Sequence, residues 1–378
     1  MPIDRRDMLG GLLGTALAAA PATRALAQGA PAAAPPATGW TKLPTEPYPG
    51  KQDDIVFVSR SVGWYGNGKG RVYGTTDGGD SWTKLLDKPG TFVRALGFVD
   101  ERVGILGNIG PGSFPGVTDT NPLYRTTDGG KSWSPVTRIT GPAPAGICAI
   151  DVLRQPFVNS GVLDYRVTLR AGGRVGGPAH LLTSTDLGQS WVSQDMTAST
   201  AMILDVHFVN EKIGFIAGAS DADVSVSNAV VLKTRDGGKT WRRVYVSKRP
   251  FEITWKLAFP SPKIGYVTVQ NYNPDAGVVD RVVAKTTDGG ETWQEIPLVK
   301  DHRVQQLGIG FVDERHGWVG AAPGGFETED GGATWRPVDM GRAVNKLRII
   351  RDENGTRVVA IGVDVRRLDL PPAKRALR

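Results

Sequence analysis

Cysteine and histidine are scarce in this sequence, and their scarcity excludes two kinds of framework. Cys148 is the single cysteine among 378 residues, so a scaffold of disulfide bonds is excluded. The four histidines are scattered singly along the chain, which argues against a metal cluster built from Cys and His. We therefore expect no metal site and no cofactor.

Charged residues are also few, at 22% of the chain, whereas glycine (49) and proline (26) are frequent. This abundance of Gly and Pro favours short elements joined by turns, as in an all-β protein. The 10 Trp, 8 Tyr and 11 Phe are too many aromatic residues for a disordered chain. The length and the 40% hydrophobic content suffice for one large domain or two ordinary ones.

Residues 1–27 have the features of an export signal. Arg5 and Arg6 precede a mildly apolar stretch, and Ala25 and Ala27 are the small residues that a signal peptidase requires. The paired arginines predict a twin-arginine signal, and an ordinary signal peptide is the alternative. We therefore expect an exported protein, located in the periplasm.

Residues 28–38, rich in Ala and Pro, are predicted to form a tether. No segment after it has the apolar length of a transmembrane helix. Removal of residues 1–27 lowers the net charge only from +7 to +6, so the mature chain is mildly basic. An exported chain with this modest charge and no nucleic-acid-binding motif is not expected to bind nucleic acid.

Six copies of one octapeptide organise the rest of the chain. Each copy has Thr or Ser first, Asp third, Gly fifth, Ser or Thr seventh and Trp eighth. Their aspartates and tryptophans are Asp77 and Trp82, Asp128 and Trp133, Asp186 and Trp191, Asp236 and Trp241, Asp288 and Trp293, and Asp330 and Trp335. Successive aspartates are 42 to 58 residues apart, which is the size of a four-stranded propeller blade.

The residue types of the octapeptide are those of a tight hairpin turn. The Asp side chain can accept hydrogen bonds from nearby backbone N–H groups, and Gly supplies a positive φ. The Trp begins the next strand with a large apolar face. A Ca²⁺ loop is the alternative, but each copy offers one recurrent acidic ligand where such loops need several. We therefore expect a structural role for these residues.

The blade count is seven, and the last blade is incomplete in sequence. Two apolar strands, 345–350 and 357–361, begin a seventh blade that has no octapeptide. The segment Trp40–Leu43 matches Trp82–Leu85, the fourth strand of the first blade. We predict an all-β, seven-bladed β-propeller over residues 39–370, in which the N-terminal strand completes the last blade and hides its open edge. Residues 371–378 are expected to be a basic tail.

These repeats resemble those of BNR/Asp-box propellers, and within them the photosystem II stability/assembly factor family. The resemblance rests on the Thr-x-Asp-Gly-Gly-x-Thr-Trp turn and on the preceding Phe-x-Asp/Asn-x-x-x-Gly turn, and it covers nearly all of residues 40–370. It implies a non-catalytic protein that binds a protein partner, with a newly made membrane-complex subunit as the expected class. We expect a monomer without catalytic residues. The resemblance also implies a compartment like the thylakoid lumen as the alternative to the periplasm, if the cell is photosynthetic.

Two other classes of function stay open at this point. Asp-box propellers also include sialidase-like glycoside hydrolases, which need an arginine cluster and a tyrosine nucleophile. The Arg-Ile-Pro opening typical of such enzymes is absent, and Tyr73 and Tyr124 occupy equivalent packing positions in their blades. A small-molecule or redox protein is the third class, but no phosphate-binding or haem motif supports it.

Binding is expected at the loops that join the second and third strands of each blade. These loops are long in blades two to five and short in blades one and six, and loops on a rigid scaffold commonly carry function. We predict that basic residues of this face contact the partner, because arginine is favoured at interfaces. The candidates are Arg94, Arg170, Arg174, Lys256, Arg281 and Lys346.

Overall fold

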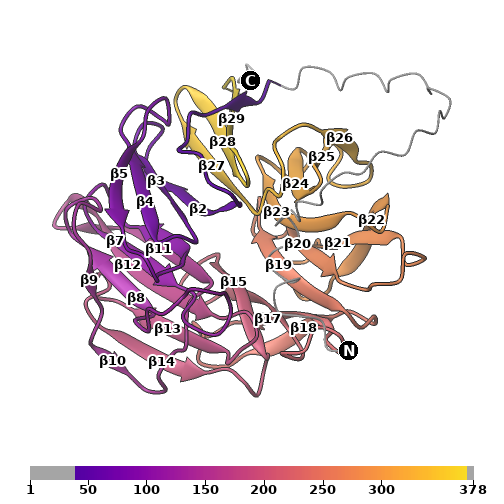
Figure 1. Cartoon of the computed structure of the whole chain (residues 1–378), viewed down its shortest axis with the longest axis horizontal. Helices are drawn as coiled ribbons and strands as arrows, with labels where there is room; N and C mark the ends of the chain where they lie inside the picture. The colour runs from indigo at the N-terminus through magenta and orange to yellow at the C-terminus, as the bar shows by residue number, and fades with distance from the viewer. Residues whose placement is uncertain (1–38, 373–378) are drawn as a thin grey trace, which may run out of the picture.

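The computed structural model describes residues 39–372 and arranges them in seven β-sheets around a ring (Figure 1). The predicted all-β, seven-bladed propeller is thereby confirmed. The export signal (1–27), the tether (28–38) and most of the tail (371–378) lie outside the described residues. Within residues 39–372, no helix is long and apolar enough to cross a membrane.

Blades one to three occupy the first part of the ring. Blade one contains β2 (Gln52–Phe57), β3 (Gly63–Asn67), β4 (Arg71–Thr75) and β5 (Thr83–Asp87). Blade two contains β6 (Val93–Phe98), β7 (Gly104–Asn108), β8 (Leu123–Thr126) and β9 (Ser134–Pro135). Blade three contains β11 (Ala149–Asn159), β12 (Val162–Gly173), β13 (His180–Ser184) and β14 (Trp191–Asp195). A fifth strand, β10 (Ile139–Thr140), pairs with β14 in parallel.

Blades four to seven complete the ring. Blade four contains β15 (Met202–Phe208), β16 (Gly214–Ala219), β17 (Ala229–Thr234) and β18 (Arg242–Val246). Blade five contains β19 (Glu252–Ala258), β20 (Gly265–Asn271), β21 (Asp280–Thr286) and β22 (Gln294–Lys300). Blade six contains β23 (Gln305–Phe311), β24 (Gly317–Ala322), β25 (Gly325–Thr328) and β26 (Arg336–Val338). Blade seven contains β27 (Lys346–Asp352), β28 (Gly355–Ile361), β29 (Val365–Leu370) and β1 (Thr41–Lys42).

The N-terminal strand closes the ring, as the sequence predicts. β1 pairs antiparallel with β29, and the Leu43 N–H donates to the Val365 carbonyl at 2.9 Å. Trp40 packs edge-on against Trp318 of blade six, with ring centroids 5.9 Å apart. The first strands of neighbouring blades contact each other all the way round, including β2 with β27. Blade seven is therefore held by both ends of the described chain.

Five of the seven blades are built around a phenylalanine at or directly after the end of the first strand. In five blades this Phe packs edge-on against the octapeptide Trp, with ring centroids 5.9 to 6.3 Å apart; the pairs are Phe57–Trp82, Phe98–Trp133, Phe208–Trp241, Phe259–Trp293 and Phe311–Trp335. The second strand of these blades begins with a glycine, and a Cβ at Gly104 would come within 2.5 Å of the Phe98 ring. Glycine is therefore required there by space.

In three blades the residue after that glycine stacks on the phenylalanine of the next blade. Trp64 stacks on Phe98 of blade two with ring centroids 3.6 Å apart, and Tyr266 stacks on Phe311 of blade six at 3.9 Å. Such offset or parallel aromatic contacts add stabilisation beyond the apolar area that they bury. Each of these phenylalanines therefore packs against the Trp of its own blade and against an aromatic residue of the preceding blade.

The octapeptides form hydrogen-bonded turns between third and fourth strands. In blade four, Asp236 Oδ1 accepts from the Thr240 N–H at 2.9 Å, and Oδ2 accepts from the Thr240 hydroxyl at 2.6 Å. Both glycines of this turn have positive φ, 80° at Gly237 and 98° at Gly238. In blade two, hydrogen bonds led by the Ser132 hydroxyl hold the pKa of the equivalent Asp128 at about 2. These carboxylates are satisfied within their own turns.

Truncation of Leu43 tests the closure of the ring. Leu43 is 2% exposed, so Leu43→Ala is expected to lower the free energy of unfolding by about 3 kcal/mol through lost burial and a residual cavity. Lys42→Ala is the matched control, because that side chain is 62% exposed. Urea unfolding of both variants is the measurement. Equal effects of the two changes would contradict closure by this strand.

Candidate functional site

The long loops of blades two to five lie on the face opposite the octapeptide turns, and they fold over the centre of the ring. Apolar residues of these loops, such as Val117, Val175 and Val224, join inner-strand residues in one hydrophobic cluster. Trp255 of β19 is a buried member of that cluster, at 1% exposed. The centre of the loop face is therefore filled with packed apolar side chains.

Five of the six basic residues expected on that face are placed differently by the structure, whereas Arg174 lies in the loop between β12 and β13 as expected. Arg94, Lys256 and Lys346 lie on the first strands β6, β19 and β27, and Arg170 and Arg281 lie within β12 and β21. All five are between 2% and 6% exposed. Their expected location in an exposed loop patch is corrected, because each side chain is turned into the body of the ring. Contact of these residues with a partner stays a prediction.

Three of these arginines bind the protein's own groups. The Arg174 guanidinium donates to the carbonyls of Pro111 at 2.6 Å and Ile109 at 3.2 Å, and so joins two loops. Arg281 donates to the Val304 carbonyl at 2.7 Å. The Arg170 guanidinium lies 3.4 Å from the centroid of the Phe208 ring.

Arg94 and Trp255 meet across the middle of the ring. Arg94 belongs to blade two and Trp255 to blade five, and the guanidinium lies 5.0 Å from the indole centroid. Arg94 also forms an ion pair with Asp53 at 2.7 Å. Next to Trp255, the Lys256 ammonium donates to the Leu204 carbonyl at 2.6 Å. These contacts and the hydrophobic cluster occupy the central channel on its loop side.

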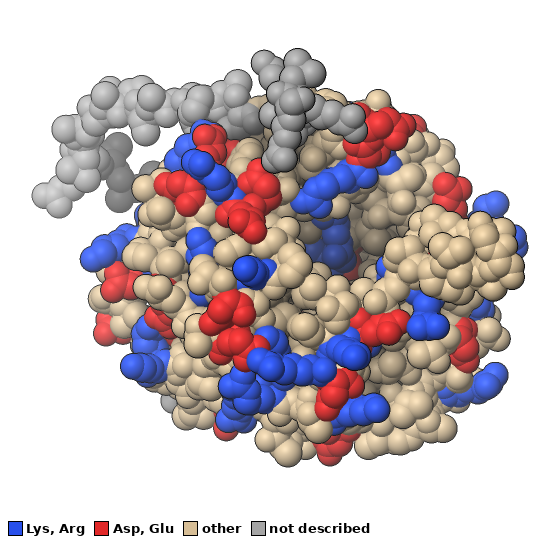
Figure 2. All heavy atoms as spheres, turned by 180° about the vertical axis from the view of Figure 1, so that it is seen from behind, with Lys and Arg blue, Asp and Glu red and all other residues tan. Residues whose placement is uncertain are grey.

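On the octapeptide side the channel widens into a cavity of about 370 Å³, which we call the central cavity. A space-filling view of one face of the ring shows a hollow at its centre with basic side chains inside (Figure 2). The cavity is lined by the ends of the first strands of six blades. Its polar lining residues are Asp151, Arg154, Asp205, His207, Lys346 and Arg348, and its apolar lining includes Phe57, Leu96, Phe98, Ile150, Leu257 and Ile350.

Asp54 forms ion pairs with two cationic side chains that line the central cavity. Its carboxylate pairs with Lys346 at 2.6 Å and with Arg348 at 3.1 Å, and it accepts the Leu96 N–H at 2.8 Å. Burial alone would raise the pKa of Asp54, but the two cations outweigh burial and lower it. Removal of one partner from such a buried pair leaves an uncompensated charge. These contacts join blades one, two and seven.

Asp151 is the cavity acid whose negative charge is least stabilised by nearby cations. Burial raises its pKa to about 7, the nearby Asp205 also raises it, and Arg170 opposes the shift. His207 Nδ1 lies 4.0 Å from Asp151 Oδ1, and burial lowers the pKa of His207. Near neutral pH the histidine is therefore neutral and Asp151 is partly protonated. Arg348 is paired with Asp54, whereas the Arg154 guanidinium donates to the Val99 carbonyl at 3.0 Å, so Arg154 is the cavity arginine that can bind an anionic group.

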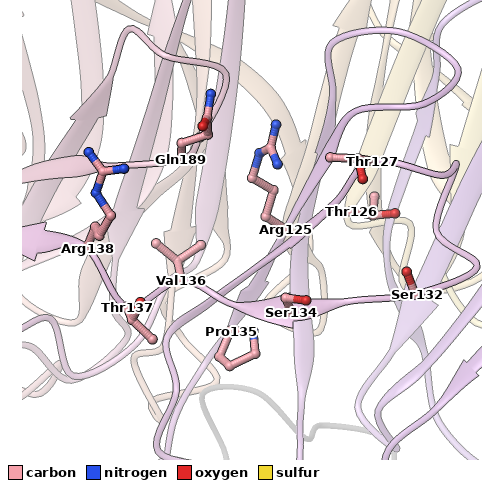
Figure 3. Close-up of a pocket in the computed structure, with 11 residues that line it drawn as sticks. Arg125, Thr126, Thr127, Ser132, Ser134, Pro135, Val136, Thr137, Arg138 and Gln189 are labelled. Atoms are coloured by element: carbon pink, nitrogen blue, oxygen red, sulfur yellow. The ribbon is translucent and has the colours of Figure 1, made fainter.

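A second, shallower groove of about 270 Å³ lies between blades two and three. Figure 3 shows Arg125, Arg138 and Gln189 projecting in the same direction from it. Arg125 Nε donates to the Leu187 carbonyl of the next octapeptide turn at 2.8 Å. That contact gives Arg125 a role in holding the two blades together.

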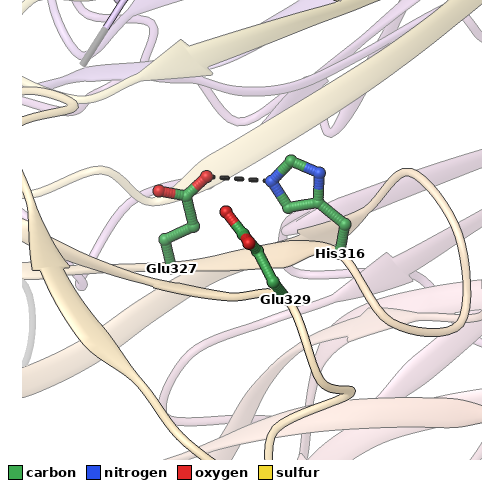
Figure 4. A group of neighbouring side chains, drawn as sticks. All are labelled: His316, Glu327 and Glu329. Carbon is green, nitrogen blue, oxygen red and sulfur yellow. Dashed lines mark hydrogen bonds and ion pairs between the residues drawn. The ribbon is translucent and has the colours of Figure 1, made fainter.

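A cluster of His316, Glu327 and Glu329 in blade six has ligand atoms within 4.8 Å of one another (Figure 4). His316 Nε2 and Glu327 Oε1 are 2.8 Å apart. Arg336 already pairs with both carboxylates, at 2.7 Å from Glu327 and 3.3 Å from Glu329. The cluster is an ion-pair network in which the guanidinium supplies the positive charge.

Comparison with known proteins agrees with this architecture. Residues 124–135, which contain the second octapeptide, match the family described as BNR/Asp-box repeat. The chain thus contains a match to the BNR/Asp-box repeat within its propeller. A relative of this Asp-box propeller is the photosystem II assembly lipoprotein Ycf48 of Synechococcus sp. (strain CC9902), 23% identical over 223 residues. That alignment covers 48% of this chain and 64% of the relative, which is less than two thirds of its length.

Solved structures share the fold of this Asp-box propeller. "YCF48 bound to D1 peptide" has a TM-score of 0.58 at 16% identity and covers 89% of this chain and 99% of that one. Ycf48 from Cyanidioschyzon merolae has a TM-score of 0.59 at 17% identity, with 88% and 99% covered. The GH74 enzyme of Niastella koreensis reaches 0.58 at 16% identity, with 84% and 52% covered. The resemblance to photosystem II assembly factors is confirmed.

The acids of the central cavity were missed in the sequence. Asp151 and Asp205 line the cavity and interrupt apolar stretches at the starts of β11 and β15, and that pattern is the signal that marks them. Asp54, which pairs with two cations of the cavity, follows Gln52 and Asp53 in β2 and has no such signal. Asp54 and Asp205 also accept a backbone N–H from the next blade's first strand, from Leu96 at 2.8 Å and Leu257 at 3.0 Å. These aspartates therefore hold blades together and shape the site.

The raised pKa of Asp151 predicts a pH dependence of stability. The folded state binds a proton that the unfolded state releases between about pH 4 and pH 7, so this group lowers stability as the pH rises through that window. Asp151→Asn removes the effect and is expected to stabilise the protein by about 2–4 kcal/mol more at pH 8 than at pH 4. Thermal unfolding at both pH values measures it, with the exposed Asp164→Asn as control. Parallel pH profiles for wild type and Asp151→Asn would contradict the assignment.

Proposed function

We propose that this protein is an exported, non-catalytic binding and assembly factor that holds a segment of a membrane-complex subunit. The observation that carries the proposal is the likeness of the whole ring to a propeller solved with a bound peptide, covering 89% of this chain. The similarity to a photosystem II assembly lipoprotein supports the same class of partner. Export would place this propeller beside the exported segments of membrane subunits.

The central cavity is the proposed binding site. It is filled on the loop side and open on the octapeptide side, so a chain would enter from one face. Arg154 offers the planar, bidentate geometry that suits carboxylates, and the apolar wall suits hydrophobic side chains. Arg348 is already engaged by Asp54 and by the Ile55 carbonyl. Of the six basic residues expected to contact a partner, Lys346 lines this cavity. The proposed ligand is an extended segment with carboxylate groups, bound by a monomeric propeller.

Peptide binding tests the site. Overlapping 15-residue peptides from the exported loops of the host's membrane-complex subunits are screened, and the best binder is titrated by fluorescence anisotropy. Arg154→Ala is expected to weaken binding about 5- to 20-fold, because a charge-assisted hydrogen bond is lost. Arg102→Ala is the matched control, since Arg102 is an exposed arginine of a turn on the same face and lies outside the cavity lining. A peptide whose affinity is unchanged by Arg154→Ala, or the absence of any binding peptide, would overturn the proposal.

A glycoside hydrolase is the second candidate, and one observation favours it. Asp151, with a pKa of about 7, and Asp205 line the same cavity, and a raised acid beside a second carboxylate is the arrangement of glycosidases. Asp205 is already engaged, because it pairs with Lys256 at 3.2 Å and accepts the Leu257 N–H. This engagement favours binding over hydrolysis.

A panel of fluorogenic glycosides separates the two candidates. We expect no turnover above the uncatalysed rate by wild-type protein between pH 5 and pH 8. Turnover that is retained in Asp164→Asn and lost in Asp151→Asn would establish the hydrolase and reject the non-catalytic assignment.

A further inference from the structure

Blade three carries a β-hairpin that is much longer than its equivalents. β11 and β12 pair from Ala149 with Gly172 to Asn159 with Val162, whereas the first strands of the other blades have six or seven residues. The turn at the end, Ser160 and Gly161, has φ values of 49° and 81°. The end of the hairpin therefore extends beyond the sheet, on the face of the octapeptide turns.

The end of this hairpin concentrates exposed apolar side chains. Nine large hydrophobic residues are exposed among residues 39–372, and five of them lie within nine residues of this hairpin. They are Phe157, Val158, Val162, Leu163 and Tyr165, and Val158 is the most exposed at 73%. Exposed apolar groups gathered in this way mark an interaction site.

Apolar groups cover both faces of the hairpin end, which we call the apolar tip (residues 156–165). Val158 and Leu163 are paired opposite each other and share one face, because side chains alternate along a strand. Phe157 and Val162 lie on the other face. A protein surface would cover one face of such a tip, whereas a lipid environment would surround it.

Arginines lie at the base of the tip. The Arg154 guanidinium is 4.6 Å from the centroid of the Tyr165 ring, and the Arg166 guanidinium is 5.7 Å from that of Phe157. Asp164 is the single charged residue of the tip, and its carboxylate accepts the Tyr165 N–H at 2.7 Å. In this arrangement the apolar end would contact the acyl chains, the Tyr165 ring would lie at the membrane interface, and the two arginines would contact anionic headgroups.

We propose that the apolar tip inserts into the headgroup region of a bilayer that contains anionic lipid. The three residue steps from Pro156 to Asn159 span about 10 Å, which matches an interfacial insertion of about 5–10 Å. Deeper insertion is excluded, because the open strand edges of the tip have N–H and C=O groups that need water. The inference is independent of ligand binding in the central cavity.

Vesicle co-sedimentation tests the proposal. Vesicles of phosphatidylglycerol and phosphatidylcholine are expected to bind wild-type protein, and Val158→Ser/Leu163→Ser is expected to lower the partition coefficient at least 10-fold. Val192→Ser/Val226→Ser is the matched control, since these valines are 63% and 59% exposed elsewhere on the ring. Equal loss in both double variants, or equal binding to vesicles of phosphatidylcholine alone, would overturn the proposal.

Site-specific fluorescence provides a second readout that does not depend on affinity. Leu163→Cys is labelled with a polarity-sensitive dye, and the native Cys148 does not interfere because it is buried. A blue shift on addition of the mixed vesicles, absent for labelled Val192→Cys, is expected. A blue shift without vesicles that grows with protein concentration would show that a second copy covers the tip and would overturn the proposal.

Discussion

A phenylalanine at or directly after the end of the first strand is the contact on which five of the seven blades depend. Its ring lies where a Cβ of the following glycine would be, and it packs edge-on against the Asp-box Trp of the same blade. In three of these blades an aromatic residue of the preceding blade also stacks on it, as Trp64 does on Phe98. Because these rings are shared by two blades, neighbouring blades stabilise one another.

Closure sets the character of the central cavity. Seven first strands come together at the centre, and their polar groups have little access to water there. Asp54 meets this constraint through Lys346, Arg348 and the Leu96 N–H, so its charge is compensated by groups of the two neighbouring blades. Asp151 is compensated less well, and burial raises its pKa to about 7. Several of the charged groups that join the blades therefore also line the cavity, among them Asp205, Lys346 and Arg348.

The repeated turns and the ring could be predicted from the sequence because their residue types are local. Asp77 to Trp82 recurs six times with few changes, and Trp40–Leu43 repeats the strand after it. The placement of Arg94 and Lys256 could not be predicted, because the direction of a side chain on a first strand depends on bulges at Val93/Ala95 and Thr254/Leu257. The long hairpin of blade three could not be predicted either. It contains no octapeptide, and its length becomes visible only from the backbone pairing of β11 with β12.

The two ends of the central channel differ, and this difference is the centre of the functional account. Apolar residues of the long loops and inner-strand residues such as Trp255 fill one end, while the octapeptide end stays open. Site-specific photo-crosslinking in the host's own membranes tests it most directly, with benzoyl-phenylalanine replacing His207 in the cavity or Val226 on the loop face. The account predicts adducts with one membrane-complex subunit at position 207 and none at position 226. Adducts confined to position 226 would contradict it.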